Sequence, residues 1–215
     1  NMSLMRTTLV PSMLDTVVRN IRRGNEAARL FELANVYLAQ LPLTELPHER
    51  KTLSLGVYGA GEDFFSAKGA FEALAAQMRV RFSYVPATRP FLHPGKCAAV
   101  LLNGEEIGYL GELAPDIAEQ LVIETSVFLG ELNFEKLSAC ANGDIKYNPL
   151  PKFPEIKRDL ALVAPEEMTC AQVEQVISES CKYLTDVHLF DVYRGAQVGE
   201  GKKSMAFSLT FTPHE

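Results

Sequence analysis

Residues 157–195, "KRDLALVAPEEMTCAQVEQVISESCKYLTDVHLFDVYRG", decide the fold of the C-terminal part of this chain, because they hold a strand, a helix and a second strand in succession. The helix is expected over 169–184, with Thr169 as its N-cap. Its apolar positions are Val173, Val176, Ile177 and either Cys181 or Leu184. A glycine-containing hairpin at 196–203 then leads into a third strand, "SMAFSLTF" (204–211). The order β-α-β-β is the first two-thirds of a split β-α-β plait, so the sequence predicts a ferredoxin-like domain that lacks its last helix and strand.

A change of composition separates this part from the rest of the chain. The stretch "SACANGDIKYNPLPKFP" (138–154) has three prolines, a glycine and two asparagines in seventeen residues. We therefore predict a domain over 1–140, a linker over 141–154 and a second domain over 155–215.

The first region mixes helices with strands in an irregular order. Apolar residues at helical spacing predict helices near 10–23 and 66–78, and a short helix begins at Pro115. Strands are expected at 29–39, 52–59, 80–86 and 126–134, with a loop over 40–51. Asn103-Gly104 lies between two apolar runs and predicts a tight hairpin. This pattern favours an antiparallel sheet with helices, so the whole chain is assigned to the α+β class.

Composition narrows the functional classes. The chain has 215 residues, 47% of them apolar, and a formal net charge of −6, which excludes a strongly basic nonspecific nucleic-acid binder. No stretch is apolar enough to cross a membrane and the N-terminus does not resemble a signal peptide, so a cytoplasmic location is expected. The four cysteines form no C-x-x-C pair and are expected to be reduced and mostly buried: Cys97, Cys140, Cys170 and Cys181.

Three motifs that suggest enzyme chemistry are weak. The glycines of "GAGEDFFSAKG" (59–69) do not have the spacing of a phosphate-binding loop, so we expect a turn that caps a helix and places Phe64 and Phe65 in the core. His93 and Cys97 in "HPGKC" would suit nucleophilic catalysis, but no second histidine or acid lies close in sequence to orient the imidazole. The remaining histidines are too scattered for a metal site. Glu105 and Glu106 are read as a solvated charge run.

Basic and aromatic residues gather in the second domain. Such a combination on a sheet is how many proteins bind single-stranded RNA. The basic residues are Lys152, Lys157, Arg158, Arg194, Lys202 and Lys203, and the aromatic ones are Phe153, Phe190, Tyr193 and Phe207. Because alternate residues of a strand must face the helix, Phe190 and Phe207 are expected in the core.

Several stretches together resemble the C-terminal part of the β subunit family of bacterial phenylalanyl-tRNA synthetases. The resemblance covers nearly the whole chain, in order. Its segments are "MSLMRTTLVPSMLDTVVRN", "RLFELANVY", "DFFSAKGAFEAL", "FLHPGKCAAVLLNGEEIGYLGEL", "PDIAEQL", "PKFPEIKRDLALV", "LFDVYRG" and "GKKSMAFSLTF". It implies a class II synthetase-like domain that has lost catalysis, followed by an anticodon-binding domain.

The resemblance also implies what this chain does not do alone. An active class II site holds ATP phosphates with one arginine after the strand that corresponds to "RLFELANVY" and with another on a glycine-rich closing helix. Here no lysine or arginine lies between that strand and Arg50, and the closing helix "FEKLSAC" has neither glycine nor arginine. We expect no catalytic residue, metal or cofactor in this chain, while the complete enzyme would use ATP and Mg²⁺ and its α subunit would supply the sites for phenylalanine and ATP.

The partners implied are the α subunit, in an α2β2 enzyme, and tRNA-Phe. Residues expected to contact the α subunit are Met5, Arg6, Met13 and Val17, and those expected to contact tRNA are Lys157, Arg158, Tyr193, Arg194, Lys202 and Lys203. Since the ferredoxin-like domain would be incomplete, the chain is also expected to self-associate through uncovered apolar surface. Two alternatives remain: a stand-alone protein-interaction module, and a small enzyme that uses Cys97 and His93.

Overall fold

The computed structural model describes residues 4–40, 42, 44–141, 143, 147 and 153–212. The chain divides into two compact units, Asn1–Asp144 and Ile145–Glu215. Most of the predicted linker, 141–154, lies outside the described residues. The two units contain helices and antiparallel sheets, so the predicted α+β class is confirmed.

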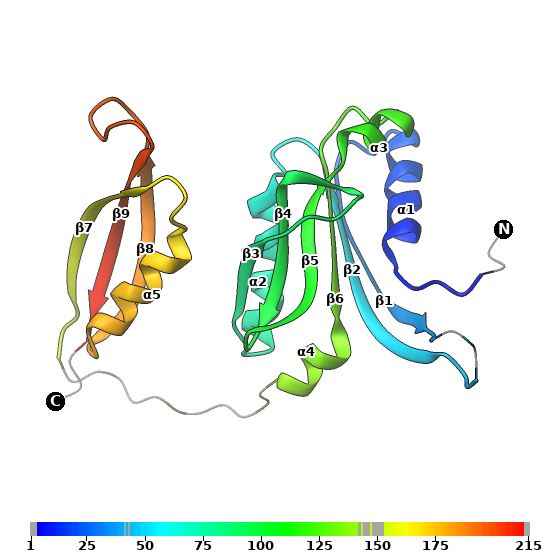
Figure 1. Cartoon of the computed structure of the whole chain (residues 1–215), viewed down its shortest axis with the longest axis horizontal. Helices are drawn as coiled ribbons and strands as arrows, with labels where there is room; N and C mark the ends of the chain where they lie inside the picture. Colours follow the sequence, from blue (N-terminus) through cyan, green and yellow to red (C-terminus); the bar gives the residue numbers. More distant parts are fainter. Residues whose placement is uncertain are drawn as a thin grey trace. The chain divides into compact units, whose positions relative to one another are not determined.

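The first unit is built on a six-stranded sheet with the order β1-β2-β6-β5-β4-β3 (Figure 1). Neighbouring strands all run antiparallel. The strands are β1 (Ala28–Leu38), β2 (His48–Tyr58), β3 (Phe82–Pro86), β4 (Leu92–Leu102), β5 (Glu105–Leu113) and β6 (Val127–Asn133). The helices are α1 (Val10–Arg22), α2 (Phe64–Gln77), α3 (Pro115–Gln120) and α4 (Phe134–Cys140).

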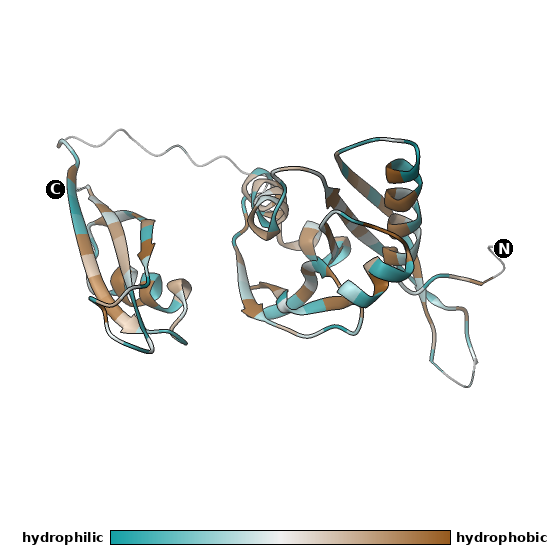
Figure 2. Ribbon diagram, turned by 90° about the horizontal axis from the view of Figure 1, so that it is seen from above, coloured by the Kyte–Doolittle hydropathy of each residue, from teal (hydrophilic) through white to brown (hydrophobic). Residues whose placement is uncertain are grey.

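Helices α1 and α2 cover opposite faces of this sheet. Because successive residues of a strand point to opposite faces, β2 contributes Leu55 and Val57 to the core beneath α2, and Tyr58 to the core beneath α1. Figure 2 shows the alternation of apolar and polar residues along α1 that allows one side of this helix to be buried. The centre of the sheet is therefore closed on both sides.

Three expectations for the first unit were wrong. Strand β2 begins at His48, because its pairing with β1 continues as far as the pair Leu38 and His48. The loop predicted over 40–51 therefore ends four residues earlier than expected. Asp63 caps α2, and Phe65, two residues beyond it, is 72% exposed rather than in the core. The cysteines are not mostly buried either, since only Cys97 is buried and Cys140 is exposed.

The second unit has the predicted order of elements. Its three strands form a sheet with the order β7-β9-β8, and one helix covers it. These elements are β7 (Ile156–Pro165), α5 (Cys170–Ser180), β8 (Leu184–Tyr193) and β9 (Lys202–Phe211). Thr169 caps α5 as predicted: its side chain accepts a hydrogen bond from the Gln172 backbone N–H at 3.3 Å. The core lies between α5 and the middle of β9.

Details of the second unit differ from the sequence prediction. Helix α5 ends at Ser180, so Leu184 begins a strand instead of extending the helix. Val176 is 69% exposed on the outer side of α5. Phe207 is fully buried as expected, but Phe190 is 54% exposed. Phe190 falls where the pairing of β8 with β9 shifts by one residue, which removes it from the regular alternation of the strand.

Candidate functional site

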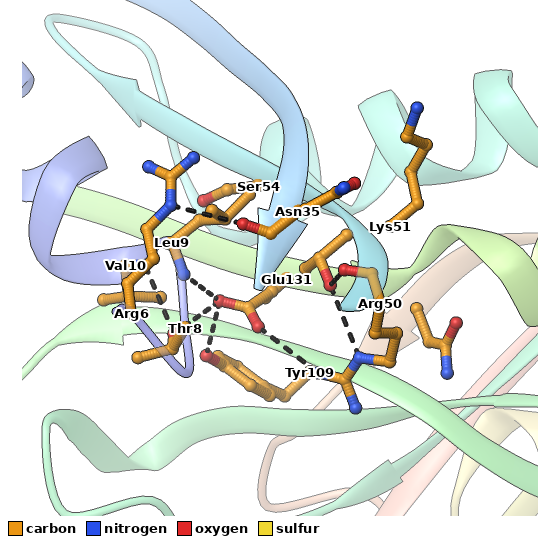
Figure 3. Close-up of polar contacts among 12 residues, drawn as sticks. Arg6, Thr8, Leu9, Val10, Asn35, Arg50, Lys51, Ser54, Tyr109 and Glu131 are labelled. Carbon is orange, nitrogen blue, oxygen red and sulfur yellow. Dashed lines mark hydrogen bonds and ion pairs between the residues drawn. The ribbon is translucent and has the colours of Figure 1, made fainter. Parts of the chain in front are cut away.

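A polar cluster of the first unit surrounds one buried carboxylate, Glu131 on β6. This side chain is only 5% exposed (Figure 3). Its Oε2 accepts hydrogen bonds from Thr8 Oγ1 at 2.5 Å and from the Leu9 backbone N–H at 3.0 Å. The Tyr109 hydroxyl donates to the same oxygen at 3.5 Å. One carboxylate thus joins the residues just before α1 to two strands of the sheet.

The only guanidinium beside this carboxylate in the described residues belongs to Arg50. Its Nη2 lies 4.0 Å from Glu131 Oε1, and its Nε donates to Thr52 Oγ1 at 3.4 Å. Burial raises the pKa of the Tyr109 phenol, and the negative charge of Glu131 raises it further. On the α1 face of the sheet, the Glu131 carboxylate therefore already has hydrogen-bond donors from its neighbours, and Arg50 is its ion-pair partner.

The segment that precedes α1 is fastened to β1 as well. The Tyr37 N–H donates to the Arg6 carbonyl at 2.8 Å, and the Arg6 guanidinium lies 2.8 Å from Glu32 Oε1. Residues 6–9 therefore lie across the sheet and are held at both ends, by β1 and by Glu131. This arrangement fixes where α1 starts.

The four residues predicted to contact a partner subunit do not form one surface. Met5 is 64% exposed, and the Arg6 side chain is about one-third exposed. Met13 and Val17, in contrast, are 3% and 0% exposed and pack in the core beneath α1. These two are poor candidates for direct contact, because they already fill the chain's own interior; the exposed side of α1 carries Asp15, Arg19 and Arg22 instead.

The six residues predicted to contact RNA are divided between the two faces of the second sheet. Lys157 pairs with Thr210 of β9, and Tyr193 pairs with Ser204 of the same strand. Thr210 and Ser204 point to the side of β9 opposite the buried Phe207, so Lys157 and Tyr193 lie on the face away from α5. Arg158 pairs with Leu209 and so lies on the α5 side. Lys202 is exposed at the start of β9.

The other two basic residues are engaged by Glu166, in the turn between β7 and α5. Lys203 is 9% exposed, and its ammonium donates to the Glu166 carbonyl at 2.7 Å. The Arg194 guanidinium lies 2.9 Å from the Glu166 carboxylate and lowers the pKa of that carboxyl. Lys203 thus has a structural partner and little accessible surface, whereas Arg194 is exposed and can exchange its partner.

The alternative of a cysteine nucleophile receives no support from the local chemistry. Cys97 is 8% exposed, and burial raises the pKa of its thiol, which disfavours the reactive thiolate. His93 Nδ1 accepts a hydrogen bond from the Gly95 N–H at 3.0 Å within its own loop. Among the described residues, no three His, Cys, Asp or Glu side chains are grouped as metal ligands would be, and no helix has the length and apolar character needed to cross a membrane.

Sequence reasoning missed Glu131, although a signal was present. In "SVFLGELNF" it is the one charged residue of a strand whose other positions are apolar, small or amide-bearing. A charged residue inside such a strand is expected to be paired, because burying it alone is too costly. Glu105 and Glu106 are exposed beside the hairpin turn, as predicted, and they also form surface ion pairs with Lys136 and Arg89.

Comparison with known proteins covers both units. The family model for the phenylalanyl tRNA synthetase beta chain CLM domain matches residues 1–134, and the ferredoxin-fold anticodon binding domain matches residues 151–215. The phenylalanine–tRNA ligase beta subunit of Clostridium tetani is 42% identical over 212 residues, and that of Bacillus subtilis is 39% identical over 228 residues. These alignments cover 97% and 99% of this chain.

The same comparisons show that the chain corresponds to part of its relatives. It spans 27% of the Clostridium tetani subunit and 28% of the Bacillus subtilis subunit. The resemblance found in the sequence is confirmed by matches that extend over both units and preserve their order. The chain therefore belongs to the phenylalanyl-tRNA synthetase β chain family.

Proposed function

We propose that this chain is a non-catalytic scaffold and tRNA-binding portion of a phenylalanine–tRNA ligase β subunit. It would pair with a catalytic α subunit in an α2β2 enzyme of the cytoplasm. The α subunit would supply the sites for phenylalanine and ATP, and the complete enzyme would use Mg²⁺. The second unit would contact tRNA-Phe. The family match supports this proposal, together with the matched ferredoxin-fold anticodon binding domain.

The observation that carries the scaffold role is the cluster around Glu131. A nucleotide triphosphate needs cationic groups that are free to meet its phosphates. On the α1 face of this sheet a buried carboxylate stands beside Arg50, and a phosphate placed there would be repelled by the carboxylate and would have to compete for the guanidinium. The same carboxylate binds the residues just before α1 and so fixes the position of this helix, as expected of a scaffold that presents α1 to a partner.

For the contact with the α subunit, the observed burial favours the exposed side of α1 and the segment before it. Met5 and Arg6 remain in this proposed interface, while Met13 and Val17 would act indirectly, by holding α1 on the sheet. For tRNA, the exposed face with Lys157 and Tyr193 is the favoured part, with Lys202 at the start of β9 and Arg194 after β8, whereas Arg158 lies on the other side of the sheet. Lys203 would support the turn at Glu166 rather than touch RNA directly.

Mixing this chain with the α subunit of a close relative tests the proposal. Gel filtration is expected to show a complex, and an Arg19→Glu/Arg22→Glu double variant is expected to weaken it, because the reversed charges stand on the exposed side of α1. The chain alone is expected to show no phenylalanine-dependent exchange between ATP and pyrophosphate. Exchange by the purified chain, or failure to form any complex, would contradict the scaffold role.

A further inference from the structure

A cavity of about 710 Å³ opens between the start of α2 and the strand β3 at one edge of the first sheet. Its wall is largely apolar and includes Phe64 and Phe65 of α2, Tyr84 and Pro86 of β3, Ala98 of β4 and Phe128 of β6. The rings of Phe64 and Phe65 meet edge to face, with their centroids 5.8 Å apart. Phe65 is 72% exposed, so an aromatic surface lies at the cavity without cover from the described residues.

The strand that forms one wall of the cavity also has an unpaired backbone edge. β3 is the last strand of the sheet and pairs only with β4 among the described strands. The Ala87 N–H donates to the Cys97 carbonyl at 3.1 Å, and hydrogen-bonded positions alternate along an antiparallel pair. The backbone N–H and C=O of Tyr84 therefore point away from β4. A main-chain donor and acceptor thus stand at the rim of an apolar cavity.

Charge at the cavity is biased toward carboxylates. Asp63 lies at the rim, and only its Oδ1 is engaged by the capping hydrogen bond from Ser66 N–H, at 2.7 Å. Glu62 is neutralised by Arg29, whose guanidinium donates two hydrogen bonds to it at 2.7 and 3.0 Å, and Lys96 is paired with Glu112 at 2.5 Å. The group left without a counter-ion among these cavity residues is the Asp63 carboxylate.

We propose that this edge is a docking site for an extended segment of another polypeptide, which adds to β3 as a further strand. One aromatic or large aliphatic side chain of that segment would fill the cavity. A lysine or arginine two residues away would lie on the same side of the strand and meet Asp63. Unpaired main-chain groups beside a cavity for a side chain are the two elements of recognition by strand addition, which is why a peptide suits this site better than a small apolar molecule.

The probe is the fluorescein-labelled peptide Lys-Thr-Phe-Thr-Lys, titrated into the 215-residue chain and followed by fluorescence anisotropy. Replacing its phenylalanine by alanine is expected to weaken binding about tenfold, because the cavity is then left empty. Methylating the backbone nitrogen of the phenylalanine is expected to weaken it about as much, since the hydrogen bond to Tyr84 is lost. A Glu-Thr-Phe-Thr-Glu peptide is expected to bind more weakly than the lysine peptide.

Two variants of the chain provide a matched pair. Phe65→Ser removes an exposed ring from the cavity and is expected to weaken binding about tenfold. Phe31→Ser removes a ring of similar exposure, 76%, from β1 at the opposite edge of the sheet, and is expected to leave binding unchanged. Amide chemical shifts of Ser83, Tyr84 and Val85 should move on titration while those of β1 stay fixed.

No binding of the lysine peptide at 1 mM overturns the proposal, as does binding that is equal for the N-methylated peptide or equal for the Phe65→Ser variant. The test is independent of the scaffold and tRNA-binding roles, because it uses neither the α subunit nor RNA.

Discussion

At the scale of single residues, Glu131 shows how one buried charge is tolerated. It has donors from a side chain, a backbone amide and a phenol, with a guanidinium nearby, so its lost hydration is replaced by several partners. The same contacts hold together three segments that are far apart in sequence: residues 8–9, Arg50 and Tyr109. Without the carboxylate, the Leu9 N–H would remain buried and unpaired, and the partly buried hydroxyls of Thr8 and Tyr109 would lose their acceptor.

Glu131→Ala is therefore expected to lower the free energy of unfolding of the first unit by about 2 to 4 kcal/mol. Urea denaturation followed by amide signals of the first unit measures the loss. Glu32→Ala is the control, because Glu32 pairs with Arg6 at a partly exposed site and its removal should cost less than about 1 kcal/mol. Equal losses for the two variants would show that the cluster is not the anchor of this unit.

The residue scale is also where sequence reasoning was least reliable. Helical spacing correctly placed Met13 and Val17 on the apolar side of α1, but it could not say whether that side faces the chain's own sheet or a partner; the structure shows the former. Lys203 was grouped with other lysines by proximity in sequence, whereas its burial follows from its place beside Met205 on the side of β9 that faces α5. Both outcomes depend on tertiary contacts that a local pattern does not contain.

At the scale of helices and strands, prediction was more successful, because periodicity and capping are local. The signals for α1, α2, the Asn103-Gly104 hairpin and the Thr169 cap all correspond to observed elements. The ends of elements were less accurate where pairing decides them. β2 extends to His48 through its ladder with β1, and Phe190 leaves the alternation of β8 through a shift of register.

Close approach between strands gives a prediction at this scale. A Cβ on Gly108 of β5 would lie 2.0 Å from the Glu131 carbonyl oxygen of the neighbouring strand, whereas a Cβ on Gly56 would meet the flexible Met13 side chain at 2.8 Å. Backbone cannot move without disturbing the sheet, but a methionine can change rotamer. Gly108→Ala should therefore destabilise the first unit by at least about 2 kcal/mol more than Gly56→Ala does.

Thermal unfolding of the two glycine variants, compared with the unaltered chain, measures this difference. Equal midpoints for Gly108→Ala and Gly56→Ala would mean that β5 and β6 can separate at Gly108 without cost, and that the sheet is less rigid than its pairing indicates. Since Glu131 lies opposite Tyr109 in the same ladder, the Gly108 variant is also expected to disturb the buried cluster.

At the scale of the whole molecule, the two units differ in how the faces of their sheets are covered. The first unit has helices on both faces of its sheet, while the face of the second sheet away from α5 carries small and polar residues of β9: Ser204, Ala206, Ser208 and Thr210. Small side chains leave room for bases to approach a sheet, and Tyr193 and Lys157 on the same face offer stacking and charge. The open face is thus the proposed RNA-contacting part of the second unit.

The proposed contact of this face with tRNA-Phe should depend on salt concentration. Each lysine that meets a phosphate releases bound counter-ions, so the logarithm of the binding constant falls with the logarithm of salt concentration by about 0.7 to 0.9 per contact. A Lys157→Ala/Lys202→Ala variant should therefore bind a tRNA-Phe transcript about tenfold more weakly and lose about 1.5 from this slope. The measurement is anisotropy of labelled tRNA across a KCl series.

Lys68→Ala, which removes a lysine paired with Glu72 on α2 of the first unit, should leave both quantities unchanged. A double variant with the affinity and salt slope of the unaltered chain would mean that RNA, if it binds, does so elsewhere than on the open face of the second sheet.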